Sequence, residues 1–593
     1  MAIATGAAIY VGLVTDAGNE TSQIRLRQAL PPSQLKGYVS SQACRTCHPA
    51  EYSSWHDSYH RSMTQTPAPG NVLAEIEGGL FRGETSRVGS NQFVLYRRDN
   101  EYWVKMSPFW RRQWEEGLSA PHNKPIDLRI VLMTGSHRQQ NYWVTDPLDD
   151  NLELFPVGIV WLRELGRHIP QRDVFLSTKL PSNPKMRWRE KCVHCHSTGF
   201  GWVTDRQELR VAEYGISCEA CHGPAAQHVR KNRNPFRRFA LHTSTNDDIT
   251  IVNPAELGAV RSIQACAVCH MAVSRYTLRC YDPGRDDLDD IRRSPPVEMR
   301  NSMPNRFWPD RMVRVGGREG PAVFDSPCFT TDGNFTCLSC HSMHKSAPDD
   351  QLKAGMRTNE ACLQCHQDYR TKLSDHTHHR ANSSGSRCYN CHMPHTSWNL
   401  IKATRSHQIS NPNLAKDTAA RRPNACNLCH LDRTLLWTSK HLNQWYGHAP
   451  AQVTTEQRTI GAGPLWALKG DAVVRGLVTW SMGWQPAQQA AGTHWIAPYL
   501  AYLATDTYTV VRIAARRSLR TLPGFEALDF DPVDIKTSTW QQNQRRIIQR
   551  WQQITHEHVA DPSLLLGPAG RLDKQRITAM LSKRDNTPVY ISE

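Results

Sequence analysis

Eight copies of one short motif, Cys-x-x-Cys-His, constrain this 593-residue chain more than any other feature. Together they use sixteen of the 18 cysteines. Numbered 1 to 8 in chain order, the motifs are Cys44-Cys47-His48, Cys192-Cys195-His196, Cys218-Cys221-His222, Cys266-Cys269-His270, Cys337-Cys340-His341, Cys362-Cys365-His366, Cys388-Cys391-His392 and Cys426-Cys429-His430. The motif is the attachment site of c-type haem, in which two sulfurs bond the porphyrin and the histidine ligates the iron. The sequence therefore predicts eight covalently attached haem c groups.

Two other uses of paired cysteines fit the motifs less well. Pairs about twenty residues apart, such as Cys195 with Cys218 or Cys340 with Cys362, have the spacing of zinc ribbons. Zinc, however, does not require the histidine that follows every pair. A thioredoxin-like dithiol normally occurs once and in a βαβ context. The trailing histidine at all eight motifs therefore favours haem.

The composition agrees with a core built partly from cofactors. Only 39% of the residues are hydrophobic and the mean hydropathy is −0.57, which is lean for a chain of this length. Porphyrins bring apolar surface of their own. The formal charge of +16 would suggest nucleic-acid binding, but the propionates of eight haems carry roughly −16 if ionised. We therefore expect many Arg and Lys residues beside propionates and no nucleic-acid partner.

The spacing of the motifs predicts which haems lie together. From first cysteine to first cysteine the gaps are 148, 26, 48, 71, 25, 26 and 38 residues. A gap of 25 or 26 leaves room for little beyond one haem-binding helix and a turn. We therefore expect contact between the haems of motifs 2 and 3, and again among those of motifs 5, 6 and 7.

The expected fold is mainly α with much irregular structure, a small β-rich insertion and a C-terminal α-helical domain. The alternation in Phe93 to Tyr96 and in Tyr102 to Met106 predicts a hairpin across the turn 98–100. The expected division is 1–37 an export signal or N-terminal extension, 38–70 the first haem site, 71–190 the β-rich insertion, 191–435 a seven-haem core, 440–560 the helical domain and 561–593 a C-terminal tail.

The segment after the last motif contains a short repeat. Val473-Val474-Arg475 recurs 37 residues later as Val510-Val511-Arg512. This period fits a stacked helical repeat, and the residues around Asp506 and Arg512 resemble the second helix of a HEAT repeat. An ordinary helical bundle is the alternative, because two copies are few.

Haem attachment takes place outside the cytoplasm, so we expect an exported, periplasmic or otherwise extracytoplasmic protein. Residues Ala2 to Val14 form an apolar stretch of signal-peptide length. The first basic residue is Arg25, so the usual positive start is missing. No later stretch is long and apolar enough to cross a bilayer, which leaves peripheral membrane association possible. Cys280 and Cys328 lie outside the motifs and form either a disulfide or two free thiols.

The second axial ligand decides what each haem does, since histidine or methionine makes an electron carrier and an open position makes a binding or catalytic site. The chain has 27 histidines, so nineteen lie outside the proximal positions. Nine of these stand near motifs and are candidate second ligands: His60, His137, His228, His344, His376, His378, His379, His395 and His407. Any one of them could instead lie at the surface or bind a propionate. Met63 and Met343 are the rivals, and we expect mostly bis-histidine haems.

Three stretches carry a family resemblance. Ser41 to His48 with Tyr52, Trp55, Ser58 and His60 is similar to the first haem site of multihaem cytochromes related to cytochrome c554. Gly215 to Pro224 with His228, and Cys391 to Pro394, are similar to later sites of that group. It shares haem-packing patterns with octahaem hydroxylamine oxidoreductases and pentahaem nitrite reductases. The resemblance implies a multihaem cytochrome core over roughly residues 38 to 435.

The resemblance does not by itself imply catalysis. Nitrite reductases of this type often use Cys-x-x-Cys-Lys, which is absent here, and no tyrosine can be assigned to the cross-link found in hydroxylamine oxidoreductases. Three functions stay open. The first is an octahaem electron-transfer cytochrome whose redox partner docks near exposed haem edges or the C-terminal helices.

The second is an oxidoreductase acting on a small nitrogen or sulfur compound, such as nitrite, hydroxylamine or tetrathionate, at one five-coordinate haem, with His137, His168 and Tyr142 as candidate distal residues. The third is a self-associating unit of a conductive filament or membrane redox complex, in which the chain forms a homo-oligomer.

Overall fold

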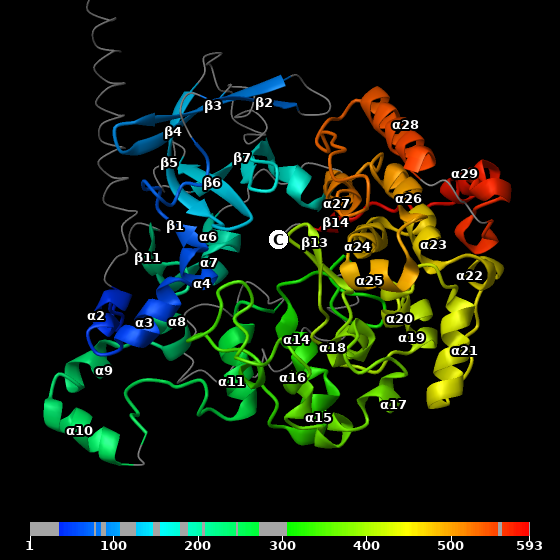
Figure 1. Cartoon of the computed structure of the whole chain (residues 1–593). Helices are drawn as coiled ribbons and strands as arrows, with labels where there is room; N and C mark the ends of the chain where they lie inside the picture. Colours follow the sequence, from blue (N-terminus) through cyan, green and yellow to red (C-terminus); the bar gives the residue numbers. More distant parts are fainter. Residues whose placement is uncertain are drawn as a thin grey trace, which may run out of the picture.

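The computed structural model describes residues 35–75, 79–84, 90–106, 126–145, 154–177, 188–203, 208–244, 247–271, 305–554 and 560–591. The expected export segment therefore lies almost wholly outside the described residues, as does Cys280. Figure 1 shows three regions: a sheet in blue and cyan, short helices of the motif segments in green, and a layer of longer helices in yellow to red.

A sheet of eight strands follows the first motif. The strands are β1 (Thr64–Gln65), β2 (Gly79–Glu84), β3 (Ser90–Arg98), β4 (Glu101–Met106), β5 (Ile126–Thr134), β6 (Gln139–Thr145), β7 (Leu154–Leu162) and β8 (Arg167–Pro170). Strands β2 to β8 form an antiparallel meander, and β1 pairs with β5. The sheet curls, because β2 also contacts β8. The expected hairpin is present, with Arg98 opposite Glu101 in the β3–β4 ladder.

The sheet makes the fold mixed rather than mainly α, which corrects the sequence expectation. Alternate side chains of β3 to β7 form an apolar interior that includes Phe93, Val104 and Tyr142. Residues of the opposite face, among them Leu132 and Trp143, pack against the segment that carries motif 2. Thus both faces of the sheet are buried, and one of them supports a motif.

The motif segments form short helices joined by irregular chain. Before and between the first four motifs lie α2 (Ser41–Arg45), α3 (Pro49–His56), α4 (Tyr59–Ser62), η1 (Gln171–Val174), β9 (Leu176–Ser177), α6 (Trp188–Lys191), α7 (Val193–His196), β10 (Ser197–Val203), β11 (Glu208–Tyr214), α8 (Cys218–His222), α9 (Ala226–Lys231), α10 (Pro235–Thr243) and α11 (Ala259–Ala267). The later motifs lie on or between α14 (Glu319–Phe324), α15 (Pro327–Asp332), η2 (Cys337–Ser339), α16 (Glu360–Leu363), η3 (Gln367–Arg370), α17 (Leu373–Thr377), η4 (Ser384–Ser386), α18 (Cys388–His392), β12 (Ser397–Asn399), β13 (Lys402–Thr404), α19 (Leu414–Ala419) and α20 (Ala425–Cys429).

The polypeptide contributes few buried apolar side chains around the later motifs. Across residues 337–397, all of which are described, Leu363 is the one fully buried hydrophobic residue. A protein segment normally needs such side chains for stability. This composition agrees with the expectation that porphyrins form much of the core there.

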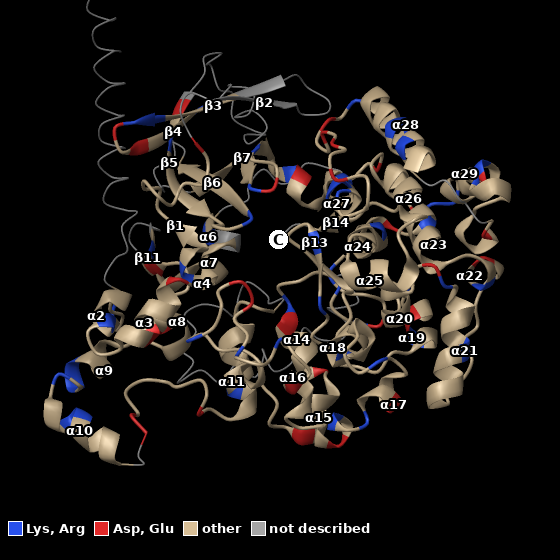
Figure 2. Ribbon diagram, viewed as in Figure 1, with Lys and Arg blue, Asp and Glu red and all other residues tan. Residues whose placement is uncertain are grey.

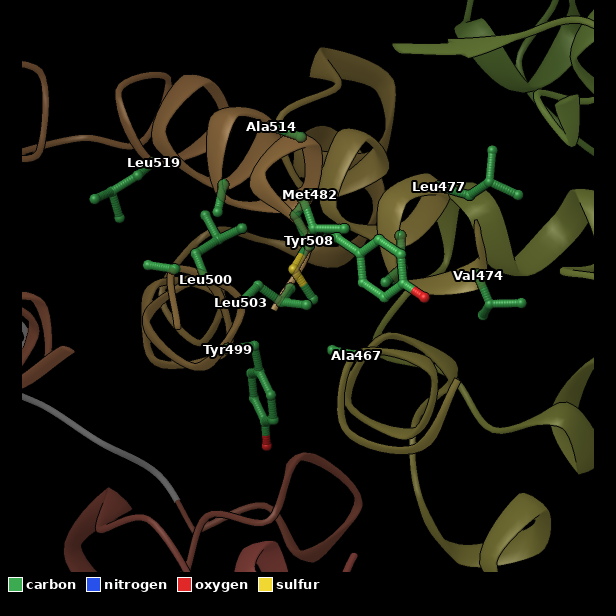
Figure 3. Packing of buried hydrophobic residues seen from close by; sticks show 14 of the residues in the cluster. Ala467, Val474, Leu477, Met482, Tyr499, Leu500, Leu503, Tyr508, Ala514 and Leu519 are labelled. Carbon is green, nitrogen blue, oxygen red and sulfur yellow. The ribbon is translucent and has the colours of Figure 1, made fainter. Parts of the chain in front are cut away.

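The C-terminal region has a hydrophobic core of its own. Its elements are α21 (Leu435–Tyr446), α22 (Thr455–Thr459), α23 (Ala462–Lys469), α24 (Ala472–Met482), α25 (Gln485–Ala491), α26 (Ile496–Leu503), α27 (Thr509–Leu519), α28 (Thr537–Ile554), η5 (Pro562–Leu564), η6 (Pro568–Gly570), α29 (Lys574–Leu581) and β14 (Tyr590–Ile591). The two repeated segments form α24 and α27, which pack on each other. Met482 of α24 lies near Leu500 and Leu503 of α26 in this core (Figure 3), and Leu477 belongs to the same cluster.

The helical region is joined firmly to the other two. Strand β14 pairs with β9, which follows the sheet. The β12–β13 hairpin packs on α24, where the Trp398 ring lies so close to Gly476 that a Cβ there would come within 2.9 Å of it. The C-terminal residues 562–591 therefore pack on the rest of the molecule. Within the described residues, no helix combines the length and apolar character needed to cross a membrane.

Candidate haem sites

Six of the eight motif histidines face a second histidine at one characteristic distance. The ring-centre distances, with the motif histidine first, are 6.3 Å for His48–His228, 6.3 Å for His222–His344, 6.2 Å for His270–His60, 6.3 Å for His341–His407, 6.1 Å for His392–His376 and 6.0 Å for His430–His379. A metal–imidazole bond is about 2 Å long, so two imidazoles on opposite sides of one iron have ring centres about 6 Å apart. The six pairs therefore fit six bis-histidine haems.

Hydrogen bonds orient the motif histidines so that the correct nitrogen is left for iron. Nδ1 of His222, His341 and His392 lies 2.6, 3.0 and 3.1 Å from the carbonyl oxygens of Val252, Asp350 and Ser410. With Nδ1–H donating to a carbonyl, Nε2 keeps its lone pair for the metal. Two of the second histidines have the same arrangement, since Nδ1 of His379 and of His407 lies 2.6 and 3.3 Å from the carbonyl oxygens of Thr377 and Arg405.

Burial keeps several of these imidazoles neutral, which is the form that binds metal. It lowers the pKa of His60 and of His430 to about 4. It also lowers the pKa of His407. At neutral pH these side chains therefore carry no proton that iron would have to displace.

Three of the nine candidate second ligands do not face a motif histidine among the described residues. His137 stacks on Tyr59 with 3.3 Å between ring centres, and Ser136 hydrogen-bonds its Nδ1. His378 stacks on Trp445 at 4.4 Å. His395 is buried against Trp480 and Trp484 of the helical region. Each has aromatic partners in place of an iron, so these contacts do not support the expected ligand role.

The histidines of motifs 2 and 6 have no second histidine opposite them in the part of the chain that the structure describes. His196 is half-buried, and its Nδ1 lies 3.1 Å from the Thr64 hydroxyl. His366 is exposed. The suggested distal residues lie elsewhere, because the Tyr142 hydroxyl and His168 Nε2 are joined at 3.0 Å within the sheet. These two motifs are therefore the candidates for open coordination.

Thiol contacts between motifs show how the sites are connected. The hydrogen-bonded thiol pairs are Cys44–Cys218, Cys195–Cys269, Cys266–Cys337 and Cys362–Cys388. Weaker electrostatic contacts join Cys221 to Cys266, Cys340 to Cys365, and Cys391 to Cys426. Because each thiol is bonded to a porphyrin edge when haem is attached, neighbouring thiols bring neighbouring edges together.

These contacts define one continuous series, in the order motif 1, 3, 4, 5, 6, 7, 8, with motif 2 attached at motif 4. Motif 2 therefore contacts motif 4, and motif 3 contacts motifs 1 and 4. The haem contact expected between motifs 2 and 3 stays a prediction. The β10–β11 hairpin brings the segments of motifs 2 and 3 together, since the backbone N–H of Gly215 donates to the His196 carbonyl at 3.1 Å.

The zinc alternative finds no support in the geometry. Over the described ranges, no group of three or more His, Cys, Asp or Glu side chains is arranged to hold a metal ion. A structural zinc site would need four such ligands. A haem iron takes four porphyrin nitrogens and two protein ligands. The histidine pairs can supply those two protein ligands.

Sequence reasoning missed two carboxylates, each of which contacts Nδ1 of one of the paired histidines. Glu319, the first residue of α14, places Oε2 2.8 Å from Nδ1 of His270. Asp248 places Oδ2 3.2 Å from Nδ1 of His228 and also pairs with Arg237. Neither carboxylate lies near its histidine in the sequence, and neither belongs to a recognisable motif.

Comparisons with known proteins agree with these sites. The doubled CXXCH motif family matches residues 330–371, and the family of cytochrome c554 and c-prime matches residues 168–223. This chain is a multihaem c-type cytochrome. Its haem c groups are bound covalently through the Cys-x-x-Cys-His motifs.

Individual relatives are distant. The multiheme cytochrome MtrA of Shewanella baltica is 25% identical over 217 residues, which is 35% of this chain and 46% of that protein. The chain thus spans about half the length of this curated relative. Among solved structures, the outer cell wall cytochrome OcwA gives a TM-score of 0.46 at 15% identity, covering 87% of this chain and 100% of that one. The undecaheme cytochrome from the S-layer of Carboxydothermus ferrireducens gives 0.33 at 14%, covering 83% and 71%.

Proposed function

We propose that this cytochrome is an extracytoplasmic octahaem electron relay. The observation that carries the proposal is the set of six histidine pairs, joined by thiol contacts into one series from motif 1 to motif 8. Haem iron with two histidine ligands exchanges single electrons and leaves no position for a substrate. The residues of the six pairs hold such irons in place, and the thiol contacts bring them close enough for electrons to pass.

Rapid mixing with less than one reducing equivalent per chain tests the relay. Electrons should redistribute among the haems of one molecule at a rate that does not depend on protein concentration. A redistribution rate proportional to concentration would show that electrons move between molecules instead, and would contradict the proposal.

Export and the HEAT-like character of the C-terminal region have separate support. The export to an extracytoplasmic compartment is supported by the chemistry of haem attachment. A HEAT-like character of the C-terminal region is supported by the pairing of α24 with α27 at the 37-residue period. The segment 38–70, proposed from sequence as a separate first haem site, also takes part in the core, since its His60 faces His270.

A second candidate function is favoured by the two unpaired motif histidines. If the iron held by His196 has an open position, it can bind and reduce or oxidise a small nitrogen or sulfur compound while the other haems supply or remove electrons. Steady-state assays with reduced viologen and nitrite, hydroxylamine or tetrathionate test this function. Turnover that carbon monoxide abolishes would support it, and no turnover with any of the three would contradict it.

The ligation itself gives a direct prediction. We expect the reduced protein to bind carbon monoxide at two haems per chain, those of His196 and His366, because the six other irons have both axial positions filled. Optical titration with carbon monoxide and the high-spin ferric EPR signal measure the number. Carbon monoxide binding at four or more haems would show that the histidine pairs do not hold iron.

We further propose that a redox partner docks where motif 1 reaches the surface. Cys47 and His48 are exposed, and α9, which carries His228, leads directly into α10. On α10 the Phe236 and Phe239 side chains are 82% and 68% exposed. Exposed arginines surround them, and Figure 2 shows this blue cluster at the edge of the molecule. An apolar centre with a cationic rim suits a partner protein whose own haem or flavin edge is ringed by acidic residues.

Charge reversal on α10 should therefore slow association with such a partner. The double variant Arg233→Glu, Arg238→Glu should lower the rate of electron exchange with an acidic flavodoxin at least about tenfold at low ionic strength, and the difference should shrink as salt screens the charges. Stopped-flow mixing at several salt concentrations measures the rate. Arg520→Glu makes the same kind of change on the C-terminal helices. A larger effect of this control would move the docking site there.

A further inference from the structure

The motif 4 histidine differs from the other motif histidines in what its Nδ1 contacts. Nδ1 of His270 lies 2.8 Å from the carboxylate of Glu319. The corresponding partners of His196, His222, His341 and His392 are a hydroxyl or a backbone carbonyl, all of them neutral. Glu319 is held in position because its Oε1 accepts a 2.8 Å hydrogen bond from the backbone N–H of Gly317.

Motif 4 is also the branch point of the series. Its two cysteines contact three other motifs, through Cys195, Cys221 and Cys337. In the series of thiol contacts, motif 4 therefore lies between motifs 1 to 3 and motifs 5 to 8. A change in the reduction potential of this one haem alters electron flow between the two halves of the molecule.

We propose that Glu319 lowers the reduction potential of the haem held by His270. This proposal rests on the proposed relay. It gives Glu319 a role in setting the reduction potential through its contact with the ligand His270. A carboxylate that accepts the Nδ1–H hydrogen bond makes the imidazole a stronger electron donor through Nε2. Greater donation, and a negative charge nearby, stabilise ferric iron relative to ferrous iron.

The other carboxylate beside a ligand should have a weaker effect. Asp248 lies 3.2 Å from Nδ1 of His228, but it also pairs with Arg237 at 2.9 Å and accepts hydrogen bonds from Asn232 and Thr250. Its charge is thus shared among several donors. Glu319 contacts the ligand at 2.8 Å, closer than Asp248 does, and its other oxygen accepts only from the neutral backbone N–H of Gly317 among the described contacts.

The haem of interest can be recognised by its ligand planes. The imidazoles of His270 and His60 are inclined at 58°, whereas those of the other five pairs lie between 5° and 31°. Ligand planes far from parallel bring two iron d orbitals close in energy, so the ferric EPR signal becomes more axial with a larger maximum g value. An EPR-monitored redox titration can therefore follow this haem among the eight.

The test compares the wild type with Glu319→Gln, which keeps the shape and the contact with Gly317 and removes the charge. We expect the midpoint potential of the large-g signal to shift to a more positive value, with the other signals unchanged. Glu319→Asp keeps the charge and should shift the potential less. Glu526→Gln makes the same substitution at an exposed glutamate of the C-terminal helical region, which carries no haem motif, and should shift nothing.

An unchanged midpoint potential in Glu319→Gln, or an equal shift of every signal, would overturn the proposal. The wild type alone gives a second test that needs no variant, because the large-g signal should titrate at a lower potential than the other bis-histidine signals. A failure of the relay appears as concentration-dependent redistribution and leaves these potentials readable, so the two failures are distinguishable.

Discussion

Replacing His376 by alanine should convert one haem per chain from low spin to high spin, whereas replacing His378, two residues away, should leave every haem unchanged. The difference arises because the His376 ring faces His392 at 6.1 Å and is inclined to it by only 5°, while His378 stacks on Trp445. Loss of the His376 imidazole leaves the iron of motif 7 with an open position, which water or carbon monoxide can fill.

The measurement is the high-spin ferric EPR signal together with the carbon monoxide stoichiometry of the reduced protein. Both should rise by one haem per chain in His376→Ala. His379→Ala should give a similar increase through motif 8, since His379 faces His430. His378→Ala is the matched control because it removes the same side chain from the same short segment. An extra high-spin haem in this control, and none in His376→Ala, would show that the pairing is misassigned.

Replacing Asp506 by asparagine should destabilise the C-terminal helices by about 3–5 kcal/mol, the usual cost of breaking a buried ion pair by removing one partner. Asp506 and Arg475 side chains are 0% and 1% exposed, and their two hydrogen bonds measure 2.6 and 3.1 Å. The variant leaves the Arg475 guanidinium buried without its counter-charge. Amide hydrogen exchange of α24 and α27 measures the change in opening free energy.

Asp529→Asn is the control, because Asp529 also pairs with an arginine, Arg516, but is 57% exposed. An exposed pair contributes about 0–1 kcal/mol, so this variant should exchange almost as slowly as the wild type. Equal effects of the two substitutions would contradict the assignment of the buried pair as the stabilising one.

The same pair gives a pH dependence. Burial alone would raise the pKa of Asp506, but the adjacent Arg475 lowers it below its ordinary value. The ion pair therefore stabilises the helices fully above the unfolded-state pKa of about 4. That stabilisation is lost as the pH falls through the lower folded-state pKa. After correction for the intrinsic exchange rate, the opening free energy of α24 and α27 in the wild type should therefore fall under acid conditions, and Asp506→Asn should lack this contribution.

The motifs and their cofactor could be read from the sequence because the chemistry of attachment is local. The second histidines were partly readable as well, since the six candidates that face a motif histidine all lie within 15 residues of some motif in the sequence. Which histidine faces which motif could not be read. His60 faces His270, and His228 faces His48, across more than one hundred residues that the fold brings together.

Two of the candidates that do not face a motif histidine have the same physical explanation. His378 and His395 stand beside motifs, as true ligands would, but tryptophans of the C-terminal helices occupy their surroundings. Sequence distance from a motif carries no information about a neighbour contributed by a remote helix. The size of the sheet was underestimated for a similar reason, because strands β5 to β8 have both faces buried and show little alternation of polar and apolar residues.

Each histidine pair, once it holds an iron, closes a loop of the chain in the way that a disulfide does. The closed loops run over residues 48–228, 60–270, 222–344, 341–407, 376–392 and 379–430. Every loop begins before an earlier one ends, so from residue 48 to residue 430 no peptide bond can be cut without opening a loop. The overlapping loops thus cross-link the haem-binding region into one unit. Its separate sites are not expected to fold as excised fragments, and its resistance to unfolding should depend on the strength of iron–imidazole bonds.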